Sequence, residues 1–315
     1  MSTISAVIGS FASHLSQVSL GLLCLAVVLH LTNLALRATA WRAILSAAVP
    51  GQRVRWRGVA GAYMAGAGMN GILPARGGDV VKVVLARRTV PGASCAVVAS
   101  GLLVETLLDG VVGGSLLVWA LWTDAVPARL LHLRPPGGPG VVVVIAAALV
   151  GALVIAAGRS RGPASRLAHR LRQGVAILES PRDYLRLVAL PQTVGWIFRV
   201  ASMYCFLHAF HVPGGLNQAA LALVAASVTS VMPLTPGGVG TQQALLMVLL
   251  AGVAAPATVL SFSVGTQLVM TTVNVLVGGV CVGLMLRTLP WRIRLATHLE
   301  PEPIPIPVPV VTSGD

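Results

Sequence analysis

The chain has 315 residues, of which 56% are hydrophobic and only 10% are charged, and its formal net charge is +13. A soluble domain of this size has about 25% charged residues, so this chain has too few charges to cover a surface that faces water. Together with a mean hydropathy of +0.85, this indicates a polytopic membrane protein. We expect a single transmembrane domain at residues 1–290 and a cytoplasmic Pro-rich tail at residues 291–315.

Long apolar runs locate the predicted helices. A helix needs about 20 apolar residues to span a bilayer. Runs of this kind are found at residues 15–36, 92–122, 140–158, 184–211 and 258–288. Two further apolar stretches, residues 58–88 and 217–256, are each broken near the middle by Pro and Gly. The sequence therefore predicts an all-α fold of spanning helices and two broken segments.

Basic residues predict the orientation. Of the 22 Lys and Arg residues, 18 flank the first broken stretch, lie at 159–186 or follow the last helix. Arg129 and Arg134 lie in one loop, and Arg76 and Arg199 lie inside apolar segments. Because basic residues concentrate in cytoplasmic loops, we expect the N-terminus outside and the C-terminus in the cytoplasm. Composition further suggests a bacterial source, and hence the inner (cytoplasmic) membrane.

The first broken stretch has basic residues at both ends, so it is expected to enter the membrane and return. About nine residues separate Asp79 from Arg88, which is too few to span, and this favours a re-entrant hairpin over two short crossings. The second broken stretch has the same two alternatives from the outside. Two hairpins entering from opposite sides have the plan of an inverted repeat. Paired broken segments of this kind mark the binding sites of transporters.

The first break, NGILPARGGD (residues 70–79), is unusually polar for its surroundings. Arg76 could bind an anion such as a phosphate, helped by the backbone N–H groups of Gly77, Gly78 and Asp79. It could instead pair with Asp79. A third alternative is that Asn70, Arg76 and Asp79 only cap a turn at the membrane interface, where an arginine can reach water.

Two acidic residues lie in an otherwise apolar predicted helix. Glu105 and Asp109 are four residues apart, so they share one helix face. Two carboxylates on one face need cations, protons or a cavity. Arg76, Lys82 and Arg199 are the cations expected at membrane depth, and we predict a polar interior shared with Arg76 or Arg199.

The second break, MPLTPGGVGTQQ (residues 232–243), offers hydroxyl, amide and backbone donors but no charge. We expect no metal site, no cofactor and no catalytic residue. The candidate substrate-binding residues are Asn70, Pro74, Arg76, Gly77, Gly78, Asp79, Glu105, Asp109, Arg199, Thr235, Pro236, Gly237, Gly238, Gly240 and Gln243.

Four segments in order, ALRATAWRAIL (35–45), MNGILPARGGDVVKVVL (69–85), LLVETLLDG (102–110) and MPLTPGGVGTQQALL (232–246), carry a family resemblance. The chain resembles the flippase-like integral membrane family, also called the lysylphosphatidylglycerol synthase transmembrane region, over about residues 15–290. Members are thought to move lipids, or to form the membrane half of proteins that make and flip aminoacylated phosphatidylglycerol. The resemblance implies that the central polar site contains Asn70, Pro74, Arg76, Gly78 and Asp79.

The chain departs from the family pattern in one respect. The second motif often carries an acid after its last Gly, where this chain has Gln242 and Gln243, which argues against a cationic substrate or ion coupling there. About 25 residues follow the last predicted helix, so we expect that the chain does not itself synthesise lysyl lipids.

Two functions follow from these observations. The first is a lipid translocator that moves a lipid, or a lipid-linked intermediate, with an anionic headgroup. The alternative is a non-transporting membrane subunit that anchors or regulates an enzyme of lipid or cell-envelope synthesis. An intramembrane enzyme is disfavoured because the sequence has no HExxH motif and no acid-rich metal cluster. Nucleic-acid binding is excluded because the arginines follow the predicted topology.

Overall fold

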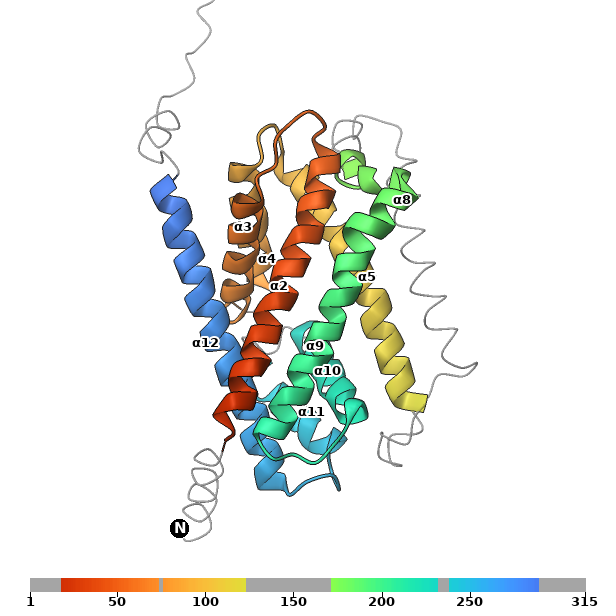
Figure 1. Cartoon of the computed structure of the whole chain (residues 1–315), viewed down its shortest axis with the longest axis vertical. Helices are drawn as coiled ribbons and strands as arrows, with labels where there is room; N and C mark the ends of the chain where they lie inside the picture. Colours follow the sequence, from red (N-terminus) through yellow and green to blue (C-terminus); the bar gives the residue numbers. More distant parts are fainter. Residues whose placement is uncertain (1–17, 74–75, 123–170, 232–237, 289–315) are drawn as a thin grey trace, which may run out of the picture.

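The computed structural model describes residues 18–73, 76–122, 171–231 and 238–288 (Figure 1). Within these ranges the protein is helical and has no β-strand beyond one isolated bridge, which confirms the all-α prediction. The elements are α2 (Leu20–Ala48), α3 (Trp56–Asn70), α4 (Gly77–Thr89), α5 (Cys95–Trp122), the short helices η2 (Ala176–Glu179), α8 (Pro181–Tyr184) and η3 (Leu185–Ala189), then α9 (Leu190–Ala209), α10 (Leu216–Val231), α11 (Thr241–Leu249) and α12 (Pro256–Thr288).

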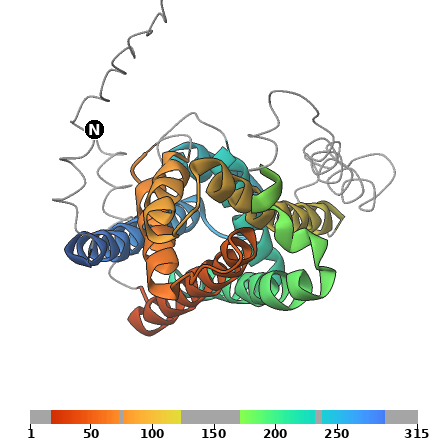
Figure 2. The same cartoon turned by 90° about the horizontal axis from the view of Figure 1, so that it is seen from above.

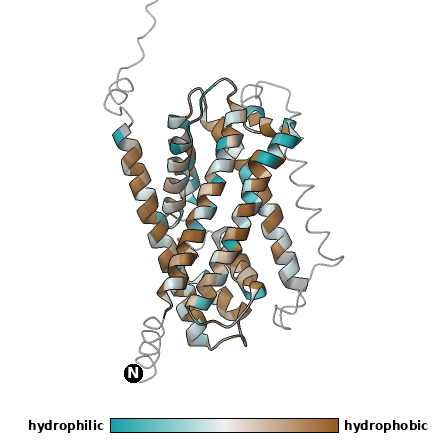
Figure 3. Ribbon diagram, viewed as in Figure 1, coloured by the Kyte–Doolittle hydropathy of each residue, from teal (hydrophilic) through white to brown (hydrophobic). Residues whose placement is uncertain are grey.

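Three of these helices, α2, α5 and α12, are long and apolar enough to cross a membrane. In Figure 3 the hydrophobic colour predominates along α12, and a hydrophilic residue appears at its last turn. Figure 2 shows the helices arranged around a common axis. The chain is therefore a multi-pass membrane protein, as its composition predicts.

Each predicted broken stretch is a pair of antiparallel helices. The pair α3–α4 enters from one end of the molecule, and the pair α10–α11 enters from the opposite end (Figure 1). Residues 71–76, of which 74–75 lie outside the described ranges, join the first pair, and residues 232–240, of which 232–237 lie outside them, join the second. The helix ends that flank each break lie toward the middle of the molecule (Figure 1), in the arrangement that an inverted repeat requires.

Small residues let α3 pack closely against two neighbours, as they do between transmembrane helices in general. A Cβ atom on Gly78 of α4 would lie 2.1 Å from the carbonyl oxygen of Gly66. On the other side, a Cβ atom on Gly68 would lie 2.6 Å from the carbonyl oxygen of Asn274 in α12. These glycines therefore fix the first helix pair against the long helix α12.

Two apolar clusters hold the two ends of the molecule. One is built around Trp41, Ile44 and Val59, where α2, α3, α4 and α5 meet. The other is built around Phe206 and Phe262, where α9, α10, α11 and α12 meet. The polar residues described below lie between them.

The first helix differs from the predicted span at 15–36. It continues to Ala48 and contains Arg37 and Arg42, which were predicted to lie in the cytoplasmic loop. Hydropathy alone ends the span at Arg37. The helix continues because Arg37 is paired with Glu105 and Asp109 inside the protein, which removes much of the cost of keeping its charge at membrane depth.

The other helices lie close to the predicted positions. α5 and α12 nearly coincide with the spans at 92–122 and 258–288. Before α9 the chain forms a π-helical turn, η3, which is followed by Pro191. A proline cannot donate a backbone hydrogen bond, and this accounts for the irregular turn. The predicted span at 140–158, the loop at 129–134 and the tail at 291–315 lie outside the described residues.

Helix ends that carry basic residues gather at one end of the molecule. The last turns of α2, α4 and α12 and the first turns of α3 and α5 all lie at the same end in Figure 1. These ends and their loops contain Arg53, Arg55, Arg57, Arg87, Arg88 and Arg287. The fold therefore brings together basic residues that the sequence places in separate loops.

Candidate functional site

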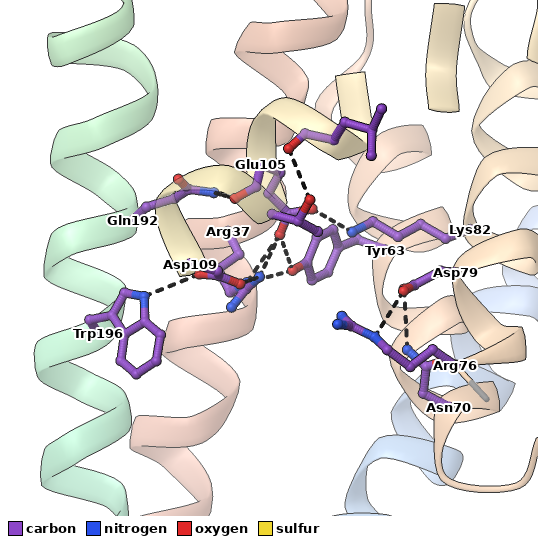
Figure 4. A network of polar contacts seen from close by, with 12 residues as sticks. Arg37, Tyr63, Asn70, Arg76, Asp79, Lys82, Glu105, Asp109, Gln192 and Trp196 are labelled. Atoms are coloured by element: carbon purple, nitrogen blue, oxygen red, sulfur yellow. Dashed lines mark hydrogen bonds and ion pairs between the residues drawn. The ribbon is translucent and has the colours of Figure 1, made fainter. Parts of the chain in front are cut away.

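Glu105 of α5 is the centre of a buried polar network (Figure 4). Its side chain is 1% exposed. Oxygen Oε1 accepts hydrogen bonds from Arg37 Nη2 at 2.7 Å and from the Tyr63 hydroxyl at 2.6 Å. Oxygen Oε2 accepts one from Lys82 Nζ at 2.7 Å. One carboxylate therefore joins α2, α3, α4 and α5.

Asp109 lies one helical turn further along α5 and shares the same arginine. Arg37 Nη2 donates to Asp109 Oδ2 as well as to Glu105. The Trp196 ring of α9 donates from Nε1 to Asp109 Oδ1 at 3.1 Å. The spacing of four residues thus turns both carboxylates toward the interior, as the sequence predicts, and Arg37 bridges them.

Lys82 is held on the opposite side of Glu105. Its side chain is 5% exposed. The Nζ atom lies 3.6 Å from the centre of the Tyr63 ring and 4.6 Å from that of the Trp41 ring. These distances allow cation–π attraction, which adds to the ion pair in a site removed from water. Gly66 leaves room for the lysine, since a Cβ atom there would lie 2.6 Å from the Lys82 Cβ.

The first break forms a second, separate cluster. Arg76 Nε lies 3.1 Å from Asp79 Oδ2, and Asn70 Nδ2 donates to Asp79 Oδ1 at 3.2 Å (Figure 4). Arg76 precedes α4 with a left-handed backbone, at φ 56°, which is unfavourable for a residue with a Cβ atom. The sequence left three alternatives open for Arg76. In the structure Arg76 pairs with Asp79.

Arg199 of α9 has a different environment. Its guanidinium carbon lies 4.6 Å from the centre of the Trp196 ring. Within the described ranges, no carboxylate lies within ion-pair distance of Arg199. The ion-pair partners of Glu105 and Asp109 are Arg37 and Lys82. Arg76 and Arg199 line the same cavity as both carboxylates, as the predicted shared polar interior requires.

Neutral polar residues connect α12 to the rest of the site. His30 Nε2 of α2 lies 2.8 Å from Asn274 Oδ1 of α12. Gln243 Nε2 of α11 donates to Gln267 Oε1 of α12. Gln243 also accepts a hydrogen bond from the Gly240 backbone N–H at 2.6 Å, so it caps the first turn of α11.

These clusters border one cavity of about 940 Å³. It is lined by residues of α2, α3, α4, α5, α9, α10 and α12, together with residues near both breaks. The predicted residues that line it are Asn70, Arg76, Asp79, Glu105, Asp109, Arg199 and Gly238.

The remaining predicted residues fall into two groups. Gly77, Gly78, Gly240 and Gln243 are not part of the lining; Gly78 packs against α3, and Gly240 adopts φ +86° before α11. Pro74, Thr235, Pro236 and Gly237 lie outside the described residues.

Several lining residues are not among those predicted from the sequence. Hydropathy places Arg37 in a loop, and Lys82 is among the cations expected at membrane depth but not among the candidate site residues. A signal for both was present, because two carboxylates on one apolar helix require two cations. Tyr63, His30 and Asn274 gave no local signal, because their roles depend on contacts between helices far apart in sequence.

The family assignment follows from a comparison with family models. Residues 4–278 match the model described as the lysylphosphatidylglycerol synthase TM region. The chain belongs to this family. The match covers all of the cavity-lining residues named above, and it confirms the resemblance found in the sequence. No curated protein matches the chain significantly.

Proposed function

We propose that this member of the lysylphosphatidylglycerol synthase TM family moves lipids with an anionic headgroup across the bacterial inner membrane. The observation that carries the proposal is the 940 Å³ cavity between helices of membrane-spanning length, which four basic and three acidic side chains of the described residues line. A charged residue at membrane depth costs about 2.5–3.5 kcal/mol on insertion scales. A simple anchor does not require such a charged lining, whereas a translocation site does.

The size of the cavity fits a headgroup. Sites for small molecules have volumes of about 300–1,000 Å³, so this cavity can hold a phosphate ester with its attached polyol. The acyl chains would remain in the surrounding lipid. Binding in this mode leaves only the polar part of the lipid to be carried through the protein.

The two broken helix pairs supply the access routes in this proposal. α4 has 13 residues and α11 has 9, so they are about 20 Å and 14 Å long at 1.5 Å per residue. Both are shorter than the roughly 30 Å of a hydrocarbon core. We therefore infer that both pairs are re-entrant and that movement of one pair at a time opens the cavity to one side.

The orientation belongs to the same proposal. We infer that the end bearing Arg53, Arg55 and Arg88 faces the cytoplasm, because basic residues are retained on that side. The N-terminus is then outside and the C-terminus inside, since α2 begins and α12 ends at opposite ends of the molecule (Figure 1).

Purified protein reconstituted into vesicles tests the proposal. A fluorescent phosphatidylglycerol placed in both leaflets should become fully accessible to an impermeant quencher within minutes, whereas about half should stay protected in protein-free vesicles. The variant Arg182→Gln, at an exposed position outside the cavity, serves as the matched control and should retain activity.

The alternative function predicts the opposite outcome. A membrane subunit that only anchors an enzyme would leave half of the fluorescent lipid protected. It would also co-purify with an enzyme of lipid or envelope synthesis. If half of the fluorescent lipid stays inaccessible to the quencher in vesicles that contain folded protein, the translocator proposal is wrong.

A further inference from the structure

The charges that line the cavity do not balance. Four basic and three acidic side chains line it among the described residues, which leaves one positive charge. His30 also lines the cavity, but a histidine with an ordinary pKa is neutral at pH 8. The surplus can be assigned to one residue by following the ion pairs.

Each carboxylate already has a cation. Glu105 and Asp109 are neutralised by Arg37 and Lys82. Asp79 is neutralised by Arg76 at 3.1 Å. The remaining charge is that of Arg199, which has no carboxylate within ion-pair distance in the described part of the chain.

The surroundings of Arg199 hold it in place without neutralising it. Its guanidinium lies over the Trp196 ring, with 4.6 Å between the guanidinium carbon and the ring centre. That ring is itself fixed by its hydrogen bond to Asp109 at 3.1 Å. A guanidinium stacked on a ring keeps its N–H groups available, and their planar arrangement matches two oxygens of a phosphate.

We propose that Arg199 binds the phosphate of the lipid and that the cavity selects headgroups with a single net negative charge. A phosphodiester without an amine, such as that of phosphatidylglycerol, balances the surplus. A zwitterionic headgroup would add a cation of its own, and a dianionic phosphomonoester would add an uncompensated negative charge. Both alternatives leave a charge unpaired at membrane depth, which is costly.

This inference rests on the proposed translocation, and the experiment separates the two. Vesicles at pH 8 contain fluorescent phosphatidylglycerol, phosphatidylcholine or phosphatidic acid. The natural protein should move phosphatidylglycerol at least tenfold faster than the other two. Arg199→Gln should lower phosphatidylglycerol movement at least tenfold and bring its ratio to phosphatidylcholine close to one.

A matched control removes charges without changing the surplus. The double variant Arg76→Gln with Asp79→Asn deletes one cation and one carboxylate from the cavity lining. It should keep the phosphatidylglycerol-to-phosphatidylcholine ratio of the natural protein, even if its rate is lower. Loss of selectivity in this variant would show that selection does not depend on Arg199 and would overturn the inference.

Other outcomes are equally decisive. If Arg199→Gln keeps the natural ratio, Arg199 does not select the lipid, although translocation stands. If phosphatidic acid moves as fast as phosphatidylglycerol, selection for a single charge is wrong. If the natural protein moves none of the three lipids, the proposed function itself fails. Uptake of radiolabelled glycerophosphoglycerol, a soluble phosphodiester with one negative charge, by those vesicles would then identify a soluble phosphate ester as the ligand.

The folding of the variants is checked by gel filtration in detergent. If Arg199→Gln does not fold, Arg199→Lys decides the question by direct binding of phosphatidylglycerol. It keeps the charge but loses the two-pronged geometry, so affinity should fall several-fold while binding of phosphatidylcholine is unchanged. Equal affinity for phosphatidylglycerol in Arg199→Lys and the natural protein would overturn the role of the guanidinium.

Discussion

Lys82 of α4 lies 2.7 Å from Glu105 of α5, and both side chains are almost fully buried. This contact ties the first broken helix pair to a membrane-spanning helix across the interior. An ion pair removed from water costs desolvation energy that its own attraction only partly offsets. The pair therefore matters less for total stability than for the fixed position of α4 beside the cavity.

Removing one partner of this ion pair should lower the free energy of unfolding more than removing both partners. Lys82→Met leaves Glu105 short of one cation and should lower the free energy of unfolding by about 3 kcal/mol. Adding Glu105→Gln leaves Arg37 and Asp109 as a balanced pair, so the double variant should recover much of the loss. Thermal unfolding in detergent compares both variants with the natural protein. A double variant less stable than Lys82→Met would contradict this description of the network.

Arg76 offers a test of backbone strain that is separate from its charge. Arg76→Ala and Arg76→Gly both remove the pair with Asp79, which is partly exposed and worth little. Only glycine adopts φ 56° without a steric penalty, so the glycine variant should be about 1 kcal/mol more stable than the alanine variant. Equal melting temperatures for the two variants would mean that residue 76 is not left-handed in solution.

Cysteine labelling tests whether both ends of the helix pair α3–α4 face the cytoplasm. In a background free of native cysteines, Arg55→Cys, Arg88→Cys and Gly215→Cys place single thiols at exposed positions. The first two should react with an impermeant reagent only from the cytoplasmic side, and the third only from outside. Labelling of positions 55 and 88 from opposite sides would rule out a hairpin at α3–α4.

Much of this architecture is predictable from sequence, because apolar length and Pro or Gly breaks are local properties. The helices α5 and α12 and both breaks follow from them. Glu105 and Asp109 could be placed on one inward face by their spacing alone. Lys82 could be named among the cations at membrane depth, but Arg37 could not be identified as the second partner, because hydropathy treats it as the end of a helix. Its pairing across 68 residues of sequence is a property of tertiary packing.

The glycines of α5 allow the cavity to be filled without disturbing the charged residues. Gly110 and Gly114 line the cavity, and a Cβ atom on either would meet no atom within 4 Å. Gly114→Leu should therefore fold at least as well as the natural protein, since leucine favours a helix over glycine by about 0.8 kcal/mol. Its side chain would occupy part of the cavity, so lipid movement should fall several-fold.

Two further glycine variants separate blocking of the cavity from loss of the fold. Gly21→Leu lies on an exposed part of α2 away from the cavity, also with open space around its Cβ position, and should leave lipid movement unchanged. Gly78→Ala places a methyl group 2.1 Å from the Gly66 carbonyl oxygen, so it should lose about 2–3 kcal/mol of stability through overpacking. Lipid movement and thermal unfolding are measured on each variant. Normal movement by a folded Gly114→Leu would mean that the lipid headgroup does not pass this part of α5, because a leucine cannot share the space with a phosphate ester.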